Sequence, residues 1–515
     1  MEMAVRLSKS DYTLACQCEK ALWLKKNMPH LLEHDEATKA KFETGHEVGE
    51  LAKGYFGPYE EVEFGKFGVM AHETKQWIES GEGKVLCEAT FKHGNLLCMV
   101  DLLVRRAGGK FDIVECKSST KVKPYHLSDI AFQAYVAEAC GVEVRKCILM
   151  HIDKDYVRAG DLSPRRLFTL EDVTEDYRMM KPEVSERIER YEAVAGYGEV
   201  PDIQIGCHCT SPNECGFKGH CWAGVPEGSV HELAGATAKT KFAMAERGVK
   251  TLEQIGRDDG LLRTLKRPLA RLQALEAAGR VDGVVLDAAK VSEFLAGMSF
   301  PLHFLDFETV QPLIPRWRGT RPYQQLPTQF SLHTVEADGS IVHKEFLARQ
   351  GADPRRAVAD ALASAIPEGS CSVAWNMRFE KGRIGELAEA FPDLAAHLGS
   401  IAEGMVDLMV PFSKGWVYVP GMRGSASIKA VLPAMFPDST ELDYHALDGV
   451  HNGVEAMDAF LRLEELPPDE AEAVREQLLR YCELDTLAMV RIWEALVSWV
   501  TVGSGSVERS VTEAA

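Results

Sequence analysis

The chain has 515 residues, which is too long for one ordinary hydrophobic core and therefore predicts two or three domains. Its hydrophobic content of 46% and charged content of 26% are typical of globular proteins, and no apolar run is long enough to predict a membrane span. The net charge of −19 excludes a protein that coats nucleic acid through bulk positive charge, but is compatible with a locally positive enzyme. The N-terminal segment lacks a signal-peptide core, so we expect a cytoplasmic protein whose 13 cysteines form no disulfide framework.

The first predicted domain covers residues 1–225. Apolar periodicity predicts two helices, a three-strand meander, a third helix and a further strand. In chain order these elements fall at residues 7–26, 36–56, 84–92, 95–104, 110–117, 128–140 and 146–152. The order favours a mixed α/β sheet with its functional edge at the meander.

The second predicted domain, residues 226–298, is rich in helices separated by glycines. It resembles a helix-hairpin-helix module, and contact with a DNA backbone and a plain spacer role both stay open. The third domain covers residues 299–502, and residues 503–515 are predicted to be a disordered tail. The third domain shows a β-β-β-α-β-α order, which favours an RNase H-like layered α/β fold.

One candidate site combines two strand ends of the meander. Asp101 is predicted to end one strand, and Glu115 and Lys117 to end the next. Glu115 and Lys117 share a face because side chains alternate along a strand, so Cys116 points into the core. Two carboxylates beside a lysine are typical of a Mg²⁺ or Mn²⁺ site at which the lysine orients water or offsets developing charge.

This D…ExK pattern resembles the PD-(D/E)xK nucleases, and two further segments resemble their RecB-type branch. Gly45-His46-Glu47 is similar to its metal-binding histidine segment, and Gln133-Ala134-Tyr135 to its glutamine motif. The resemblance implies that His46 binds metal with Asp101 and Glu115, and that Gln133 acts with Lys117. Without it, the pattern describes an edge-strand acid and an exposed Glu/Lys pair; Glu88 is either a further ligand or a solvated charge.

Three cysteines, Cys209, Cys215 and Cys221, lie in a loop rich in glycine, proline and histidine, and they predict a metal site. A local fourth ligand, Cys207, would permit zinc. The alternative fourth ligand is Cys18, about 190 residues earlier.

The segment LSKSDYTLACQCEKALWL resembles the first-cysteine segment of the iron–sulfur nucleases of the RecB type and of CRISPR adaptation. The resemblance implies a [4Fe–4S] cluster held by Cys18, Cys209, Cys215 and Cys221. Cys16 and Cys207 would then be free. We expect the cluster to hold the domain closed.

A second candidate site lies in the third domain. Asp306 and Glu308 share one face of a predicted strand, and Tyr481 and Asp485 share one face of the closing helix. Such carboxylates, drawn together, are typical of a two-metal hydrolytic site.

These segments resemble the tyrosine subclass of DEDD exonucleases, in which the tyrosine orients the attacking water. The segment Asn376 to Glu380 resembles the second motif, although the family usually has aspartate where this chain has Glu380. Asp407 and the segment Ser427-Ile428-Lys429 also match the family pattern. The resemblance implies that Asp306, Glu308, Glu380 and Asp485 hold Mg²⁺ or Mn²⁺.

Between two predicted strands of this domain, cations alternate with aromatic residues at Arg316, Trp317, Arg318 and Arg321. Single-stranded nucleic acid is held by stacking and phosphate contacts, so this loop is a candidate substrate contact. A solvated surface loop is the alternative.

Most of the chain thus resembles bacterial proteins that fuse a RecB-like iron–sulfur nuclease to a DEDD-type domain. The resemblance implies a metal-dependent nuclease that acts on nucleic acid, with DNA favoured over RNA, in repair or foreign-DNA defence, and no membrane partner. A nucleic-acid-binding scaffold with one or both sites inert, and an RNA-trimming exonuclease, are the alternatives.

Overall fold

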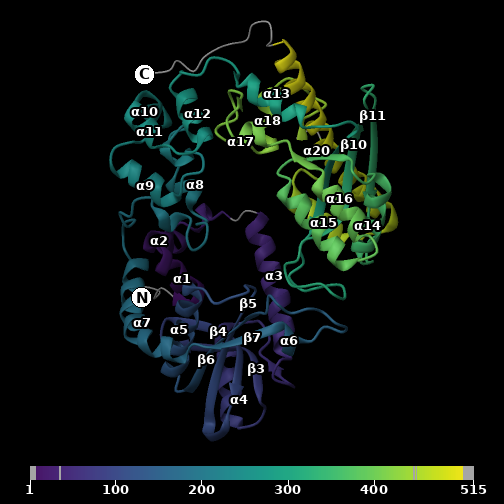
Figure 1. Cartoon of the computed structure of the whole chain (residues 1–515). Coiled ribbons are helices and arrows are strands. Elements are labelled where there is room, and N and C mark those ends of the chain that lie inside the picture. Colours follow the sequence, from purple (N-terminus) through teal and green to yellow (C-terminus); the bar gives the residue numbers. More distant parts are fainter. Residues whose placement is uncertain (1–6, 34–35, 445–446, 448, 503–515) are drawn as a thin grey trace. The chain divides into compact units, whose positions relative to one another are not determined.

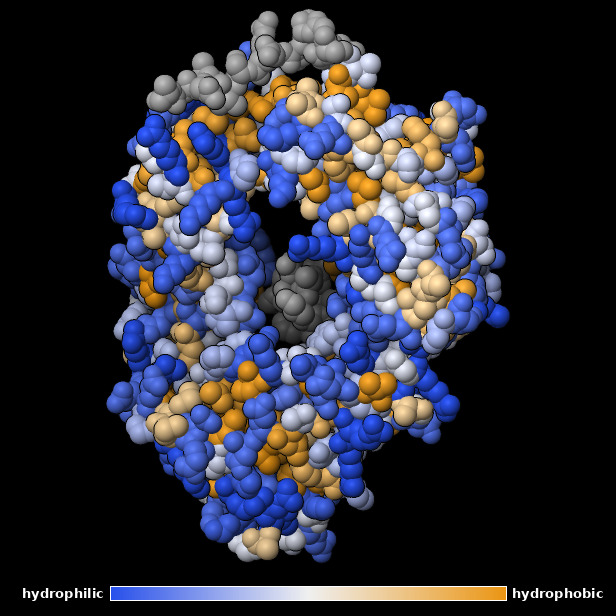
Figure 2. Space-filling view, in the orientation of Figure 1, coloured by the Kyte–Doolittle hydropathy of each residue, from blue (hydrophilic) through white to orange (hydrophobic). Residues whose placement is uncertain are grey.

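The computed structural model describes residues 7–33, 36–444, 447 and 449–502. The predicted tail, residues 503–515, lies outside this part of the chain. Helices and sheets are mixed throughout, so the predicted α/β class is confirmed (Figure 1). Polar and charged residues cover most of the face drawn in Figure 2. Among the described helices, none has an apolar stretch long enough to cross a membrane.

The chain divides into two compact units. The first unit comprises Met1–Val225 and a distant segment, Pro312–Gln324. The second comprises Pro226–Gln311 and Gln325–Ala515. The predicted helical module at 226–298 is therefore part of the second unit, and the segment at 312–324 leaves its own domain to join the first.

In the described part of the first unit, a seven-stranded sheet has the order β2-β3-β4-β5-β6-β7, with β1 parallel to β4. The strands are β1 (Leu7–Ser8), β2 (Glu60–Glu61), β3 (Val85–His93), β4 (Leu96–Arg105), β5 (Lys110–Lys117), β6 (Glu143–Ile152) and β7 (Phe168–Asp172). The predicted meander is confirmed as antiparallel β3, β4 and β5. Strand β6 then lies parallel to β5, as expected after the crossover helix α5 (Pro124–Ala139).

Apolar residues cover both faces of this sheet. One face packs against α1, α4, α5 and α7, and the other packs against α3 and Leu313 of the distant segment. The remaining helices of this unit are α1 (Lys9–Gln17), α2 (Glu19–Asn27), α3 (Glu36–Lys53), α4 (Phe67–Ser80), α6 (Pro164–Leu167), α7 (Thr174–Ala195) and α8 (Lys218–Cys221).

The single helix predicted at residues 7–26 is wrong, because the chain forms two helices that meet at Cys18. Cys18 has extended backbone angles, φ −161° and ψ 116°, and caps both helices. The start of α1 is fixed by a capping box between Ser8 and Asp11. Asp11 also pairs with Lys25 and Lys26 of α2, so the two helices are held together at the end opposite Cys18.

In the second unit, the described sheet has the order β11-β10-β9-β12-β13. Its strands are β9 (Leu302–Val310), β10 (Leu326–Val335), β11 (Ile341–Leu347), β12 (Cys371–Ala374) and β13 (Met405–Asp407). Strand β10 is antiparallel to both neighbours, whereas β9, β12 and β13 run parallel. The predicted β-β-β-α-β-α order is confirmed as β9, β10, β11, α14 (Pro354–Ala365), β12 and α15 (Arg378–Ala390).

Helices cover both faces of this sheet, and the long helix α20 crosses β9 and β10. The helices of this unit are α9 (Ala238–Glu246), α10 (Leu252–Arg257), α11 (Asp259–Thr264), α12 (Pro268–Ala277), α13 (Ala288–Ala296), α14 (Pro354–Ala365), α15 (Arg378–Ala390), α16 (Ala395–Glu403), α17 (Val410–Ser413), α18 (Ile428–Met435), α19 (Gly453–Arg462) and α20 (Pro468–Val502). A small ribbon pairs β8 (Val285–Leu286) with β14 (Val417–Tyr418).

The helical module has a core of its own within the second unit. Its helices α10 and α12 approach so closely that a Cβ on Gly256 would lie 1.9 Å from the Ala274 carbonyl oxygen. Glu276 of α12 accepts hydrogen bonds from the Tyr418 hydroxyl and the Gly421 amide, at 2.5 and 2.7 Å. These bonds attach the module to the rest of the second unit.

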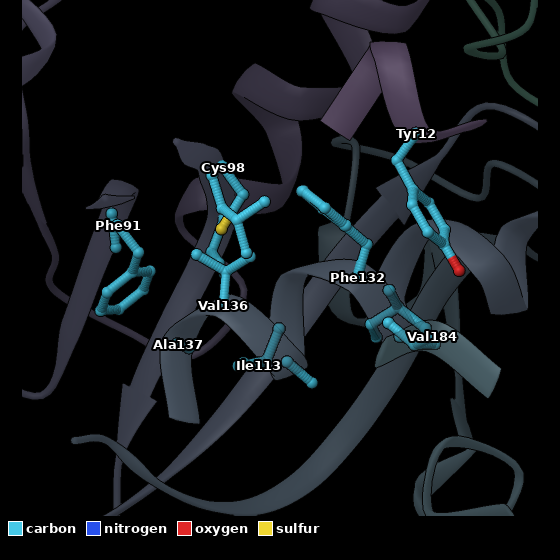
Figure 3. Close-up of a cluster of buried hydrophobic side chains, with 14 of the residues drawn as sticks. Tyr12, Phe91, Cys98, Ile113, Phe132, Val136, Ala137 and Val184 are labelled. Atoms are coloured by element: carbon cyan, nitrogen blue, oxygen red, sulfur yellow. The ribbon is translucent and has the colours of Figure 1, made fainter. Parts of the chain in front are cut away.

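Packing between α1 and α5 positions part of the first candidate site. The rings of Tyr12 and Phe132 stack at a centroid distance of 4.8 Å, and both side chains are buried (Figure 3). Lys9 precedes Tyr12 on α1, and Gln133 follows Phe132 on α5. The position of these two polar residues therefore depends on the aromatic contact.

Replacing Phe132 with alanine is expected to lower the unfolding free energy of the first unit by about 3–5 kcal/mol, because it removes a fully buried ring. Phe132→Leu should cost less, since it keeps most of the volume. Hydrogen exchange of α5 amides in increasing urea measures the change separately from the second unit. Equal stability of Phe132→Ala and the wild type would contradict this account of the core.

Candidate functional site

Asp101 lies within β4, not at its end as predicted. The ladder between β4 and β5 stops at the pair Leu102–Val114, so the two strands separate beside Asp101 and Glu115. One carboxylate oxygen of Asp101 accepts a 2.7 Å hydrogen bond from the Cys116 amide in this gap. Asp101 thus lies close to the end of β5, as predicted, because β4 and β5 separate at this point and the Asp101 side chain fills the gap.

Glu88 lies opposite Asp101, at a point that the ladder between β3 and β4 skips. Its φ of 54° is in the left-handed region, which a glutamate rarely adopts. Burial raises the pKa of Glu88, against the opposing influence of Lys53 and Lys9. Glu88 is therefore a half-buried member of the acidic group, and the reading of it as a solvated charge is wrong.

Glu115 is at the centre of a hydrogen-bonded group. Lys117 Nζ lies 2.8 Å from Glu115 Oε1, and Gln133 Nε2 lies 2.7 Å from Glu115 Oε2. The structure adds two residues that the sequence analysis missed. Lys9 Nζ lies 2.9 Å from Glu115 Oε1, and Asp129 accepts from both Lys117 and Gln133.

Charge in this first site is nearly balanced. Burial and the neighbouring Glu115 raise the pKa of Asp101 to about 7. Burial alone would also raise the pKa of Glu115, but Lys117 and Lys9 lower it well below its usual range. Glu115 is thus an anion held by two cations, whereas Asp101 takes up a proton near neutral pH.

His46 is exposed on α3, and no hydrogen bond or ion pair joins it to these carboxylates in the described part of the chain. Helix α3 does pack beside β5 and β4. The structure therefore brings Asp101, Glu115, Lys117 and Gln133 together but gives no contact for His46.

The arginine-rich loop is anchored on the first unit. Arg158 donates to the carbonyl oxygens of Pro315 and Arg316, both at 2.8 Å, and its backbone pairs with Gly319 and Thr320. The side chains of Arg316, Arg318 and Arg321 are exposed, and Trp317 is half-buried. The loop is thus held in place by backbone contacts while its cations face solvent.

This loop also reaches the strand end of the first site. The Tyr323 hydroxyl donates to the carbonyl oxygen of Ser118, the residue after Lys117. The predicted nucleic-acid contact therefore lies next to the first site, although its sequence belongs between two strands of the second unit. No sequence periodicity indicated this placement.

Four cysteines from two distant segments line one cavity: Cys18, Cys209, Cys215 and Cys221. Gln17, which precedes Cys18, donates to the carbonyl oxygens of His208 and Asn213, both at 2.7 Å, and so fixes the two segments together. Cys207 is exposed and does not line the cavity.

Cys16 faces away from this cavity. Its sulfur accepts hydrogen bonds from Tyr191 and Arg187 at 3.7 and 3.6 Å. Burial raises the pKa of Cys18 and Cys215, and the other cysteines of the cavity raise it further. A thiolate there needs a positive partner, as a metal would supply.

In the second unit, Asp306 and Glu308 on β9 lie beside Asp485 on α20. One carboxylate oxygen of each residue lies within 4.8 Å of those of the other two. The strand register puts both β9 acids on the face that α20 covers, as the alternation predicted. Three of the four predicted carboxylates therefore form one group.

This group has less compensating charge than the first site, because no ion pair reaches its three carboxylates in the described part of the chain and Lys429 acts on them only from a distance. Burial and Asp485 raise the pKa of Glu308 to about 8, and burial raises the pKa of Asp485 to about 6. Burial, Asp485 and Glu380 raise the pKa of Asp306 well above its usual range. The carboxylates cannot all ionise side by side near neutral pH without a cation.

Glu380, the fourth predicted ligand, is buried at the start of α15 but is not part of the group of three. Its Oε2 has no hydrogen-bond partner among the described residues, and burial raises its pKa to about 8. Nearby, Asn376 has a φ of 66°, and its backbone N–H donates a hydrogen bond to the Asp407 carboxylate. One buried acceptor of Glu380 is thus left without a partner among the described residues.

Tyr481 is buried on α20, and Lys429 Nζ lies 3.2 Å from its hydroxyl oxygen. Tyr444, which the sequence analysis missed, donates its hydroxyl to Asp485 at 2.5 Å. Lys429 lies over both rings, at 5.2 Å from Tyr444 and 5.3 Å from Tyr481. Lys429 is thus the cation that the structure provides at this site, above two tyrosines and next to Asp485.

Binding of Mg²⁺ to the second site is expected to release about two to three protons per chain near about pH 7, because Asp306, Glu308 and Glu380, whose pKa values are all raised, must ionise to bind it. The affinity should strengthen as the pH rises to about 8, where these carboxyls lose their protons unaided. Calorimetric titration in buffers of different ionisation enthalpy counts the protons. Asp306→Asn should reduce the number and the exposed-turn control Asp338→Asn should not; an equal heat in every buffer would contradict the raised pKa values.

Residues 303–427 match the model of a family described as a domain of unknown function (DUF2779). The matched stretch contains Asp306, Glu308 and Glu380 but ends before Tyr481 and Asp485, and it covers none of the first site. No curated protein matches the chain.

Proposed function

We propose that this protein is a metal-dependent nuclease with two hydrolytic sites, one in each unit, and that DNA is its substrate. The observation that carries the proposal is the gathering of acids from distant segments in both units. In the second unit Asp306, Glu308 and Asp485 converge within 4.8 Å, with three raised pKa values. Such a group is suited to hold divalent cations with oxygen ligands.

In the first site, Asp101 and Glu115 would hold Mg²⁺ or Mn²⁺, and Gln133 would orient Glu115 through its 2.7 Å hydrogen bond. The metal would supply Lewis-acid stabilisation of the phosphate and an activated water. Lys117 and Lys9 both contact Glu115 Oε1. A metal ion bound to that oxygen would compete with them and would leave at least one lysine free to contact the phosphate. This arrangement supports the PD-(D/E)xK interpretation.

In the second site, the Tyr481 hydroxyl would orient the attacking water, and Lys429 would hold the hydroxyl in place through their 3.2 Å hydrogen bond. Asp306, Glu308 and Asp485 would hold Mg²⁺ or Mn²⁺, and the unpaired Oε2 of Glu380 would complete the set. One observation favours an inert second site: Glu380 is outside the group of three. A nucleic-acid-binding second unit is therefore the alternative for this domain.

The loop beside the first site supports a nucleic-acid substrate. Arg316, Arg318 and Arg321 are exposed on a backbone that Arg158 and Tyr323 fix beside Lys117. Fixed cations next to a hydrolytic site would bind the phosphates that flank the cleaved bond. The net charge of −19 requires such local positive regions for any nucleic-acid partner.

The test is end-labelled DNA, with RNA in parallel, incubated with Mg²⁺ or Mn²⁺ and single-site variants. Lys117→Met is expected to reduce one activity by about 10²-fold or more, because it removes a cation from the reacting phosphate, and Asp306→Asn should reduce another because it removes a metal ligand. Lys146→Met and Asp338→Asn, which change exposed residues of the two units, should retain both activities. Unchanged digestion in the Lys117→Met, Asp306→Asn double variant would contradict the proposal; RNA digestion without DNA digestion would reassign the substrate.

We further propose that the cysteine cavity holds a [4Fe–4S] cluster. A tetrahedral zinc site with Zn–S distances of about 2.3 Å needs sulfurs roughly 3.8 Å apart. Among the described cysteines, no three sulfurs lie within 4.8 Å of one another. No three of these sulfurs are as close together as zinc needs, and four cysteines around one cavity are the set of thiolates that a [4Fe–4S] cluster takes, so we favour the cluster.

Protein purified without oxygen is expected to be brown and to contain about four iron atoms per chain. Cys18→Ala and Cys209→Ala should lose the iron, because both line the cavity. Cys16→Ala and Cys207→Ala are the matched controls and should retain it. About one zinc and no iron per chain, or iron loss in Cys207→Ala, would contradict the assignment.

A further inference from the structure

A further cluster of side chains of the types that can bind a metal ion lies on the other side of α20 from Asp485. It contains His333 on β10, His343 on β11 and Glu483 on α20. One ring nitrogen of each histidine and one oxygen of Glu483 all lie within 4.8 Å of one another, and His343 Nδ1 is 3.6 Å from Glu483 Oε1. Neither hydrolytic site uses any of these residues.

The hydroxyl groups around the cluster determine which ring nitrogens carry hydrogen. Thr486 donates its hydroxyl hydrogen to the Glu483 carbonyl oxygen, which can only accept. Its oxygen therefore accepts the 2.7 Å bond from Ser331 and the 2.8 Å bond from His333 Nδ1. Because Ser331 donates its hydroxyl hydrogen to Thr486, the Ser331 oxygen accepts the 2.9 Å hydrogen bond from His343 Nε2.

The remaining nitrogens, His333 Nε2 and His343 Nδ1, then carry lone pairs. Metal-binding histidines commonly have one ring nitrogen held by a hydrogen bond and the other on the ion, and both rings here have that hydrogen bond. Imidazoles and a carboxylate together suit first-row transition metals such as zinc, whereas Mg²⁺ prefers oxygen ligands alone.

The cluster is open to solvent on one side, which provides a path for an ion. His333 is 5% exposed, but the side chains of His343 and Glu483 are 24% and 43% exposed. The positive charge of Arg491 nearby is balanced by ion pairs with Glu494 at 3.1 Å and Glu441 at 3.4 Å. Arg491 therefore adds little repulsion to metal binding there.

We propose that His333, His343 and Glu483 form a site for Zn²⁺ or a similar transition-metal ion, separate from both hydrolytic sites. Tetrahedral zinc needs ligand nitrogens roughly 3.4 Å apart, so the ion draws the ligands together. His343 is on the edge strand β11 and is the more exposed histidine, so β11 moves toward α20. The ion thereby pins the β10–β11 hairpin to the helix that carries Tyr481 and Asp485.

The test is calorimetric titration of the full chain with Zn²⁺ in a large excess of Mg²⁺, which occupies sites of oxygen ligands. The wild type is expected to bind one more equivalent of Zn²⁺ than His343→Ala or Glu483→Ala, and to show a rise in melting temperature that both variants lack. His397→Ala is the matched control: His397 also lies near a glutamate, 3.5 Å from Glu368, but has no second histidine. Equal stoichiometry in the wild type and His343→Ala, or equal loss in His397→Ala, would overturn the proposal.

A measurement on the wild type alone avoids any effect of the substitutions on folding. Zn²⁺ is expected to protect His343 from diethyl pyrocarbonate, mapped by mass spectrometry, while His397 stays reactive. Modification of His343 at the same rate with and without Zn²⁺ would refute the site, whatever the variants show.

Discussion

Carboxylates buried side by side repel one another, and both units of this protein are built around that repulsion. In the first unit, Lys9 and Lys117 of separate elements meet at Glu115, and Asp101 takes up a proton near neutral pH. In the second, Asp306 and Glu308 are partly buried beside the buried Asp485, and their raised pKa values favour protonation, with Lys429 as the neighbouring cation. A fold does not retain such groups for stability, since buried like charges cost free energy.

The two sites relieve this repulsion differently, and the difference bears on chemistry. Glu115 already has two lysine partners, so under the proposed function a divalent cation there would compete with their ammonium groups. In the described part of the chain no lysine hydrogen-bonds to the carboxylates of the second group, so a divalent cation there would displace protons instead. The described contacts thus differ between the sites: two lysines contact Glu115 in the first, whereas Tyr444 and Lys429 lie beside Asp485 and Tyr481 in the second.

Regular patterns in the sequence predicted much of the fold and part of each site. Alternation predicted β3, β4 and β5 and the shared face of Asp306 and Glu308, because a strand fixes side-chain direction locally. Lys9, Asp129 and Tyr444 could not be predicted, since their roles arise from tertiary packing between distant elements. The attachment of residues 312–324 to the first unit was equally invisible, because it rests on hydrogen bonds from the Arg158 guanidinium to backbone carbonyl oxygens of that segment.

The central claim is that these acids are gathered to hold divalent cations. Crystals soaked in Mn²⁺ and measured for anomalous scattering test it most directly, because the signal locates each ion without reference to activity. The account predicts anomalous peaks between Asp101 and Glu115 and among Asp306, Glu308 and Asp485. Mn²⁺ bound elsewhere on the chain, with no peak at either group, would contradict it.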